Sequence, residues 1–353
     1  VYEEVVKSED DTTVKKWKPS NYSEKFTGDV LFRNALIKSL NIPTIKVQAD
    51  IGLPWVEDYA RRLGIFSPLN RDQTLGLGSS SVTLYEITKV FGHLGRLGVR
   101  MSPILIKKVL SSDDEEISGA ISLDRRFEKE TASIDADFAQ RREDFFSPQP
   151  SPTTETDASA DSNPPAEDNR SRREKILAEA KARKTPPFFF KNEKQLINPT
   201  TAYLGTTLLA GVVEEGTGAS ARVLGRPAAG KTGTTNGFYD AWFIGYTPQV
   251  ATGVWVGHDA EKSMGVGETG AKAALPIWIE YMKVAHDGLP IKSFSPTSNT
   301  VVASIDNETG MLASSTSKHV VRQAFLEGTE PTETNGDALI KDSNEFFKED
   351  LSY

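Results

Sequence analysis

Apolar side chains in residues 30–40 recur every four positions, the spacing that places them on one face of an α-helix. A residue that precedes proline disfavours helical backbone, and a proline stands at position 43, so we expect this helix to end near residues 40–41. Ser39 in the last turn and Asn41 beyond it can then turn toward one cleft, whereas positions i and i+2 inside a helix diverge. The alternative is that both polar residues only cap and turn the chain.

Three further stretches carry the pattern or the end signals of a helix. Residues 47–65 present an apolar face that ends at a glycine, the residue type favoured after a last helical turn. Residues 84–94 follow Thr83-Leu84-Tyr85-Glu86, a capping-box pattern. From Asn198 to Gly216, an N-cap asparagine and a proline at the first helical position predict another helix.

A period of two in other parts of the chain indicates strands. Residues 238–246 and 250–257 are separated by a Thr-Pro-Gln turn, so we expect them to form a β-hairpin. Residues 104–110 and 299–306 are the other expected strands.

Composition changes sharply after position 110, which suggests boundaries. Residues 111–195 are charged and rich in Ser and Pro, and we expect them to be a largely flexible insert, because they cannot bury enough apolar surface to offset the entropy of ordering. Within them, Phe188-Phe189-Phe190 is expected to dock on the domain. The insert divides residues 1–110 from residues 196–296. Residues 297–353 are expected to hold a last strand and an acidic, disordered tail.

Several classes of function are disfavoured by composition. The 353 residues include no cysteine and only four scattered histidines, so we expect no metal site and no cofactor, each histidine being a surface or packing residue. A formal charge of −8 argues against nucleic acid as a partner. No apolar run is long enough to span a membrane. The first residues include neither a methionine nor a signal pattern, and we therefore expect a piece of a longer protein.

The stretch around Lys231 supports two hypotheses. Residues 225–232 satisfy the phosphate-loop pattern G-x-x-x-x-G-K-[ST], but that loop needs a helix after the lysine, and Gly-Thr-Thr-Asn-Gly follows instead. The preferred hypothesis is that Lys231-Thr232-Gly233 lies on an antiparallel strand, as in active-site serine transferases. Three residues alone are a weak signal, so the rest of the chain must decide.

Several segments, in order, resemble the transpeptidase domain of class A penicillin-binding proteins, the 1A type especially. The segments are Trp17-x-Pro19-x-Asn21-Tyr22, the Ser39-Leu40-Asn41-Ile42-Pro43 region, Leu77-Gly78-Ser79-Ser80-Ser81, Asn198-Pro199-Thr200-Thr201, Lys231-Thr232-Gly233-Thr234, Pro276-Ile277-Trp278, and Ile305-Asp306-x-Glu308-Thr309-Gly310. They extend over roughly 230 residues, and so many matches in one order are unlikely to arise by chance.

The resemblance implies an α+β fold of the penicillin-binding and β-lactamase type. An antiparallel sheet, built partly from residues 239–257 and 299–306, would be flanked by helices, and an all-helical lobe from residues 30–100 would close the cleft.

The resemblance also implies D,D-transpeptidase activity, in which a serine forms an acyl-enzyme with a peptidoglycan stem peptide and passes it to an amine. Lys231 would provide positive charge beside the nucleophile, and Ser39 would relay a proton to the departing amine. Asn41 would orient the peptide bond. Thr232 and Thr234 would bind the terminal carboxylate, beside Gly233, and the backbone N–H of Thr234 would be an oxyanion donor. β-Lactams and cell-wall synthesis proteins are the other implied partners.

One departure from the family pattern is serious. The nucleophile motif S-x-x-K precedes S-x-N in the family, but residues 1–38 contain none, and the only candidate, Ser315-Thr316-Ser317-Lys318, comes after Lys-Thr-Gly. We therefore expect a truncated domain that is inactive alone, with a glycosyltransferase domain and a membrane anchor upstream, at the outer face of the bacterial cytoplasmic membrane. The alternatives are a non-catalytic scaffold and a related β-lactamase or D,D-carboxypeptidase.

Overall fold

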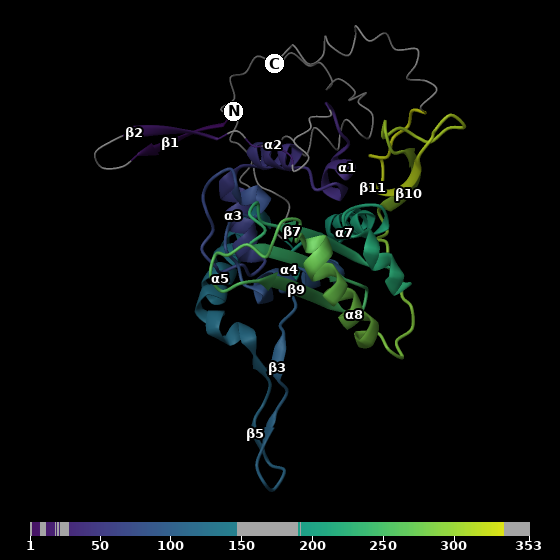
Figure 1. Ribbon diagram of the computed structural model, residues 1–353. Helices are drawn as coiled ribbons and strands as arrows, with labels where there is room; N and C mark the ends of the chain where they lie inside the picture. The colour runs from purple at the N-terminus through teal and green to yellow at the C-terminus, as the bar shows by residue number, and fades with distance from the viewer. Residues whose placement is uncertain are drawn as a thin grey trace, which may run out of the picture.

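A three-stranded antiparallel sheet lies at the centre of the computed structural model, which describes residues 2–7, 12–17, 19, 21, 28–146, 190 and 192–334. Its strands are β7 (Ala229–Thr234), β8 (Asp240–Tyr246) and β9 (Ala251–Gly257), in that order (Figure 1). The expected hairpin is thus confirmed. The sheet gains a third strand that carries the Lys-Thr-Gly motif.

Strand β8 is apolar on both faces because helices cover the sheet on both sides. Phe243 points to α8 (Leu275–Ala285), where its ring meets Trp278 at a centroid distance of 5.0 Å. Tyr246 lies on the opposite face with Phe91 of α4 (Leu84–Gly95) and packs near α7 (Pro199–Glu214). A strand buried on both faces has a nearly continuous apolar sequence, as residues 241–246 do.

The helical lobe consists of α1 (Phe32–Ile37), α2 (Asn41–Ile51), α3 (Leu53–Arg62), the short η1 (Leu75–Leu77) and α4. The expected end of the first helix was wrong by three residues, since α1 stops at Ile37 and Asn41 already begins α2. Proline 43 lies in the first turn of α2, where its missing N–H is not needed. The single helix expected over residues 47–65 is divided at Gly52, whose φ of 91° no helix accommodates.

Both expected helix starts are confirmed by their hydrogen bonds. The hydroxyl of Thr83 accepts from the N–H of Glu86 at 3.2 Å, and the Glu86 carboxylate accepts from the N–H of Thr83 at 2.9 Å, which completes the capping box. Asn198 Oδ1 accepts from the N–H of Thr200 at 2.9 Å at the start of α7.

The first part of the insert is ordered, which corrects the expectation of flexibility over residues 111–146. The expected strand at residues 104–110 is two short pieces, β3 (Ile104–Ile106) and β4 (Val109–Leu110), which pair with β6 (Ile121–Ser122) and β5 (Glu116–Ser118) in a projecting ribbon (Figure 1). The short η2 (Leu123–Phe127) and α5 (Glu128–Phe146) follow. Most of the insert's Ser/Pro-rich part, and its charged segment at residues 171–184, lie outside the described residues.

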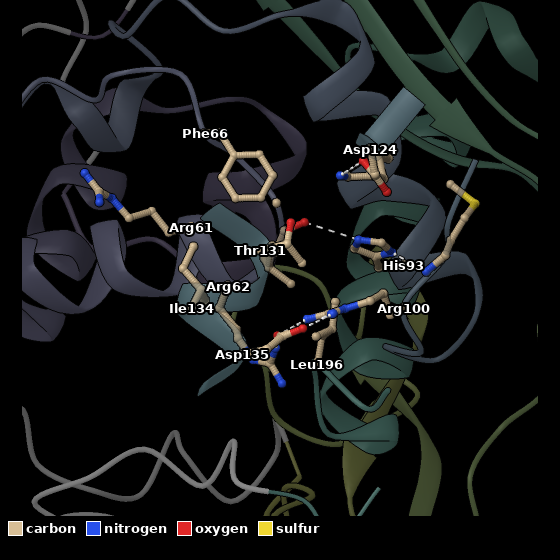
Figure 2. A pocket seen from close by; sticks show the side chains of 14 residues that line it. Arg61, Arg62, Phe66, His93, Arg100, Asp124, Thr131, Ile134, Asp135 and Leu196 are labelled. Carbon is tan, nitrogen blue, oxygen red and sulfur yellow. Dashed lines mark hydrogen bonds and ion pairs between the residues drawn. The ribbon is translucent and has the colours of Figure 1, made fainter. Parts of the chain in front are cut away.

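Helix α5 is held to the helical lobe by ion pairs that its composition alone does not reveal. Asp135 contacts both Arg62 of α3 and Arg100, each at 2.5 Å, around a cavity of about 30 Å³ (Figure 2). Phe138 is buried nearby and packs against Phe190. Of the expected docking triplet, only Phe190 is described, and it packs on the domain as expected.

The C-terminal strands form a sheet of their own. β10 (Thr300–Asp306) pairs with β11 (Val320–Leu326), and this sheet contacts α7 rather than joining β7–β9. Placing residues 299–306 in the central sheet was therefore wrong, because a period of two identifies a strand but not its partner. The remaining elements are β1 (Tyr2–Lys7) paired with β2 (Thr12–Trp17), η3 (Ala219–Leu224) and η4 (Gly270–Ala274). Within the described ranges, no helix is both long and apolar enough to cross a bilayer.

Candidate active site

Lys231 on strand β7 reaches the turn that joins α1 to α2. Its Nζ donates hydrogen bonds to Ser39 Oγ at 2.7 Å and to the carbonyl oxygen of Thr232 at 2.9 Å. The chain continues from β7 through a turn into β8, and no helix follows the lysine. The phosphate-loop hypothesis is therefore wrong, since its anion grip depends on a helix N-terminus at this point.

The surroundings of the Lys231 amine change its acid–base behaviour. Burial lowers the pKa of this amine from an ordinary 10.5 to about 8, because the charged form loses hydration. At neutral pH the group is still mostly protonated. It can nevertheless release a proton far more readily than a surface lysine, which suits proton transfer near pH 7.

Ser39 has a backbone conformation that non-glycine residues rarely adopt. Its φ is 54°, in the left-handed region, and this turns the chain sharply between α1 and α2. The Ser39 N–H donates to Leu36 O at 3.1 Å, and the next N–H, of Leu40, donates to Ala35 O at 2.8 Å. Both bonds close the end of α1 and fix the direction of the serine side chain. Strained residues of this kind concentrate at functional sites.

Residues from the helical lobe, the sheet and the loops line a cleft of about 750 Å³ next to this pair. The lining residues are Pro19, Asn21, Lys38, Ser39, Asn41, Thr74, Leu77, Gly78, Ser79, Thr217, Thr232, Thr234, Thr235, Asn236, Thr269 and Ala271. The structure thus brings together four of the six residues singled out from the sequence, and the amine of a fifth, Lys231, contacts Ser39. Gly233 lies between Thr232 and Thr234 in the strand.

Hydroxyl and amide groups dominate this lining, and lysine is its only charged residue type. A carboxylate entering the cleft would therefore meet hydrogen-bond donors and no negative side chain within the described lining. The hydroxyl of Thr234 accepts from the N–H of Gly270 at 3.0 Å, which leaves its own proton available for donation. A Cβ at Gly270 would lie 2.3 Å from Trp242 O, so glycine is required for this approach.

Two residues that sequence reasoning left without a role support the cleft. Asn21 is buried, and its Oδ1 accepts from the N–H of Ile42 at 3.3 Å in the first turn of α2, the helix that begins with Asn41. The hydroxyls of Thr217 and Thr232 lie 2.9 Å apart. The Gly-Thr-Gly sequence around Thr217, just before the Lys-Thr-Gly strand, was a signal that could have identified it.

The late S-x-x-K motif lies elsewhere. Ser315 is exposed in the connection between β10 and β11 and is not among the described residues that line the cleft. A serine outside the cleft cannot attack a substrate bound at Lys231.

His93 is one of the two buried histidines, and its hydrogen bonds define its tautomer. The N–H of Met101 donates to its Nδ1 at 3.2 Å, so Nε2 carries the proton and donates to Leu63 O at 3.2 Å. Burial, helped by the nearby Lys89, lowers the pKa of His93 to about 4. The ring is therefore neutral and acts as a packing residue between α4 and its neighbours.

Comparisons with known proteins agree with this geometry. Residues 177–282 match the penicillin binding protein transpeptidase domain, and residues 296–337 match the C-terminal domain of penicillin-binding protein 1A. Penicillin-binding protein 1A of Aquifex aeolicus is 30% identical over 321 residues, which are 91% of this chain and 34% of that protein. This chain is therefore similar to the transpeptidase part and the C-terminal domain of penicillin-binding protein 1A. Lys231-Thr232-Gly233 lies within the matched residues 177–282, whereas Ser39 and Asn41 lie outside both matched ranges.

Other penicillin-binding proteins are similar to this chain in sequence or in structure. The 1A protein of Pseudomonas aeruginosa is 30% identical over 323 residues, 91% of this chain and 37% of that protein. The chain thus spans about a third of the length of these curated relatives. The crystal structure of penicillin-binding protein 1A from Haemophilus influenzae superimposes with a TM-score of 0.64 at 24% identity, covering 94% of this chain and 45% of that one. PonA1 of Mycobacterium tuberculosis in complex with penicillin V has a TM-score of 0.52 at 18% identity, covering 79% and 62%. These structures establish the α+β transpeptidase fold.

Proposed function

We propose that this chain carries the proton-relay and carboxylate-binding half of a peptidoglycan D,D-transpeptidase site. The observation that supports this most directly is the 2.7 Å contact between Lys231 Nζ and Ser39 Oγ beside a cleft rich in hydroxyl groups. Residues 1–110 and 196–296 would form parts of the transpeptidase unit, residues 111–195 an insert, and residues 297–353 the C-terminal sheet and tail.

In the proposed reaction, a serine Oγ attacks the carbonyl carbon of the penultimate D-alanine of a stem peptide. The bond from that carbon to the nitrogen of the terminal D-alanine breaks, and the departing amine takes up a proton. An amine of a second stem peptide then displaces the serine, which forms the cross-link. A D,D-carboxypeptidase or β-lactamase would instead pass the acyl group to water.

The hydrogen-bond direction at Ser39 suits the proton delivery. Ser39 Oγ accepts from the Lys231 ammonium, so its own hydroxyl proton is free to move to the departing amine while the lysine replaces it. Asn41, at the first position of α2, would hold the peptide bond in place. Thr232 and Thr234 would donate hydrogen bonds to the terminal carboxylate, and the Thr234 N–H would donate to the oxyanion.

We further propose that this chain does not react covalently on its own. The one S-x-x-K motif, at Ser315, is not among the described residues that line the cleft, and residues 1–38 have none. The attacking serine would belong to a longer protein that acts on peptidoglycan at the outer face of the cytoplasmic membrane. PonA1, a structural relative, binds penicillin V, which supports β-lactams as ligands of that longer protein.

A fluorescent penicillin tests this proposal on this chain and on the longer gene product. Mass spectrometry should find the label only on the longer protein, on the serine of an S-x-x-K motif. Lys231→Ala in that protein should slow labelling at least about a hundredfold, the usual contribution of a general acid or base. Lys283→Ala is the control, because Lys283 pairs with Glu280 on the surface of α8 and should leave labelling unchanged.

Two outcomes would overturn the proposal. Label on Ser315 of the short chain would place the nucleophile in the β10–β11 connection. No label on either protein would favour the non-catalytic scaffold.

A further inference from the structure

Arg33 is a buried charge in the helix that leads to Ser39, and it is not among the described residues that line the cleft. Its side chain is 7% exposed and forms an ion pair with Glu215, which follows α7. Its Nε donates to Gln323 Oε1 of β11 at 3.0 Å, and its Nη1 donates to Asn307 Oδ1 after β10 at 3.3 Å. One guanidinium therefore joins α1, the end of α7 and the β10–β11 sheet, which are far apart in sequence.

The contacts of Arg33 continue toward the cleft along α1. Ile37, one turn later, packs against α7 so closely that a Cβ at Gly211 would lie 2.7 Å from its Cδ1. The N–H of Thr217 donates to the Ile37 carbonyl oxygen at 3.4 Å, and the Thr217 hydroxyl contacts Thr232 on β7. Ser39 lies two residues after Ile37. Both ends of α1 are thus fixed to the loop that follows α7, and that loop in turn contacts the Lys-Thr-Gly strand.

We propose that Arg33 is a positioning residue through which the β10–β11 sheet and the loop after α7 hold Ser39 against Lys231. Local hydrogen bonds close the end of α1 around Ser39, and the distant contacts of Arg33 and Ile37 hold α1 itself in place beside β7. Helix α1 has only six residues, too few to be stable alone. The C-terminal sheet, which lies in the residues that match the C-terminal domain of penicillin-binding protein 1A, is thereby assigned a role in arranging the cleft.

Arg62 offers a matched control for this arginine. Its side chain is 9% exposed and pairs with Asp135 at 2.5 Å where α3 meets α5 (Figure 2). Arg62 is not among the described residues that line the cleft. Either substitution removes a buried guanidinium whose carboxylate partner is 34% exposed for Glu215 and 38% exposed for Asp135, so the two should destabilise the chain to a similar degree. Only the loss of Arg33 should alter the cleft.

The experiment is a titration of the Lys231 amine by NMR in the chain with ¹³C-labelled lysine, its signal assigned with Lys231→Met. In Arg33→Met the Ser39 turn loosens and water reaches the amine, so the pKa of Lys231 should rise from about 8 toward 10.5. Arg62→Met should leave that titration unchanged. An unchanged titration in folded Arg33→Met, or an equal shift in Arg62→Met, would overturn the inference.

Gln323→Leu is a milder variant that decides the question if Arg33→Met does not fold. It removes the β11 acceptor but keeps the ion pair of Arg33 with Glu215, and it should shift the Lys231 titration in the same direction by a smaller amount. Arg33→Lys keeps the positive charge but loses the several N–H donors of the guanidinium, so it should shift the pKa of Lys231 about as much as Gln323→Leu does. If the pKa of Lys231 in both Gln323→Leu and Arg33→Lys equals that of the wild type, the role of the C-terminal sheet is rejected.

For catalysis, the inference rests on the proposed transpeptidase function, and a second measurement separates the two. In the longer protein, Arg33→Met should slow penicillin labelling by roughly tenfold or more, as small misplacements of reacting groups do, while Arg62→Met should not. If the unmodified longer protein is not labelled, the proposed function fails, and the lysine titration still decides the role of Arg33. Equal slowing in both variants would attribute the effect to lost stability and reject positioning.

Discussion

Replacing Lys231 with methionine should stabilise the folded chain at neutral pH and destabilise it in alkali. Burial lowers the pKa of the amine from 10.5 to about 8, so the folded state disfavours the charged form. At about 1.4 kcal/mol per pH unit, this fall corresponds to about 3 kcal/mol in the free energy of unfolding. Methionine keeps the apolar stem and removes the charge.

The variant also loses the two hydrogen bonds that Lys231 donates, to Ser39 and to the Thr232 carbonyl oxygen, each worth about 1 kcal/mol. Below pH 8 the lysine is charged in both the folded and the unfolded state, and the full penalty applies. The variant should then be more stable by about 1 kcal/mol. Above pH 10.5 the lysine is neutral in both states, and only the lost hydrogen bonds count, so the variant should be less stable by about 2 kcal/mol.

The sign follows from proton binding. Between pH 8 and 10.5 the unfolded chain holds a proton that the folded chain has released, so the stability of the wild type rises with pH relative to the variant. Urea unfolding of both proteins at pH 7 and above pH 10.5 measures this difference in stability. The other lysines and the tyrosines also titrate in this range, but their contributions cancel in the difference because both proteins share them. Lys283→Met, on the surface of α8, controls for the substitution itself and should change stability by less than about 1 kcal/mol.

A difference of the same sign and size at both pH values would refute this reasoning. It would mean that the amine is as well solvated in the cleft as in the unfolded chain. The proposed ease of proton transfer from Lys231 would then lose its physical basis.

Two further predictions concern the elements that frame the cleft. Glu86→Gln should cost about 3 kcal/mol at pH 7, because burial would raise the pKa of this carboxyl but hydrogen bonds from Ser67 and Thr83 lower it to about 2. The pKa of Glu86 in the folded chain lies below the unfolded value of 4.5, so this stability disappears as the pH falls toward 2. Urea unfolding of both proteins between pH 7 and pH 2 measures it, and an equal dependence of the unfolding free energy on pH in both would contradict the prediction. Asn198→Ala should lower unfolding stability by about 1 kcal/mol through loss of the bond from the Thr200 N–H. Asn198→Asp keeps the hydrogen-bond acceptor and should leave the free energy of unfolding nearly unchanged when all three proteins are compared by thermal unfolding. An equal loss of stability in both variants would rule out capping.

Local signals in the sequence predicted the parts of the fold that depend on local chemistry. The β8–β9 hairpin follows from a period of two on both sides of a proline turn. The capping box at Thr83 and the asparagine cap at Asn198 need only residues three positions away or fewer. For the same reason the Lys-Thr-Gly strand could be anticipated, since the glycines that follow Lys231 exclude the competing helix.

The parts that sequence reasoning missed depend on partners distant in the chain. The acidic composition after Ser111 predicted a solvated segment, yet Asp135 pairs with Arg62 and Arg100, which no periodicity places nearby. In the same way, apolar alternation in residues 300–306 identified a strand without indicating that β11, rather than the central sheet, would pair with it. Partner choice in a sheet is set by packing of the faces, which a single strand does not encode.

The wrong end of α1 has a physical cause that also explains why the site residues meet. The spacing of apolar residues and the position of the proline are local signals, and they predicted that Ser39 lies in the last turn of α1. In the structure Ser39 instead has a φ of 54°, which is not helical. The chain instead turns there, and the N–H groups of Ser39 and Leu40 close the end of α1 by donating to Leu36 O and Ala35 O. Arg33, earlier in α1, is held by Glu215 and Gln323, at distances of up to 290 residues along the sequence. On our proposal, these non-local contacts hold α1, and with it the turn at Ser39, in the position that faces Lys231. Local helix rules did not predict this turn because a serine rarely adopts a left-handed φ, and its neighbours in the sequence do not require one.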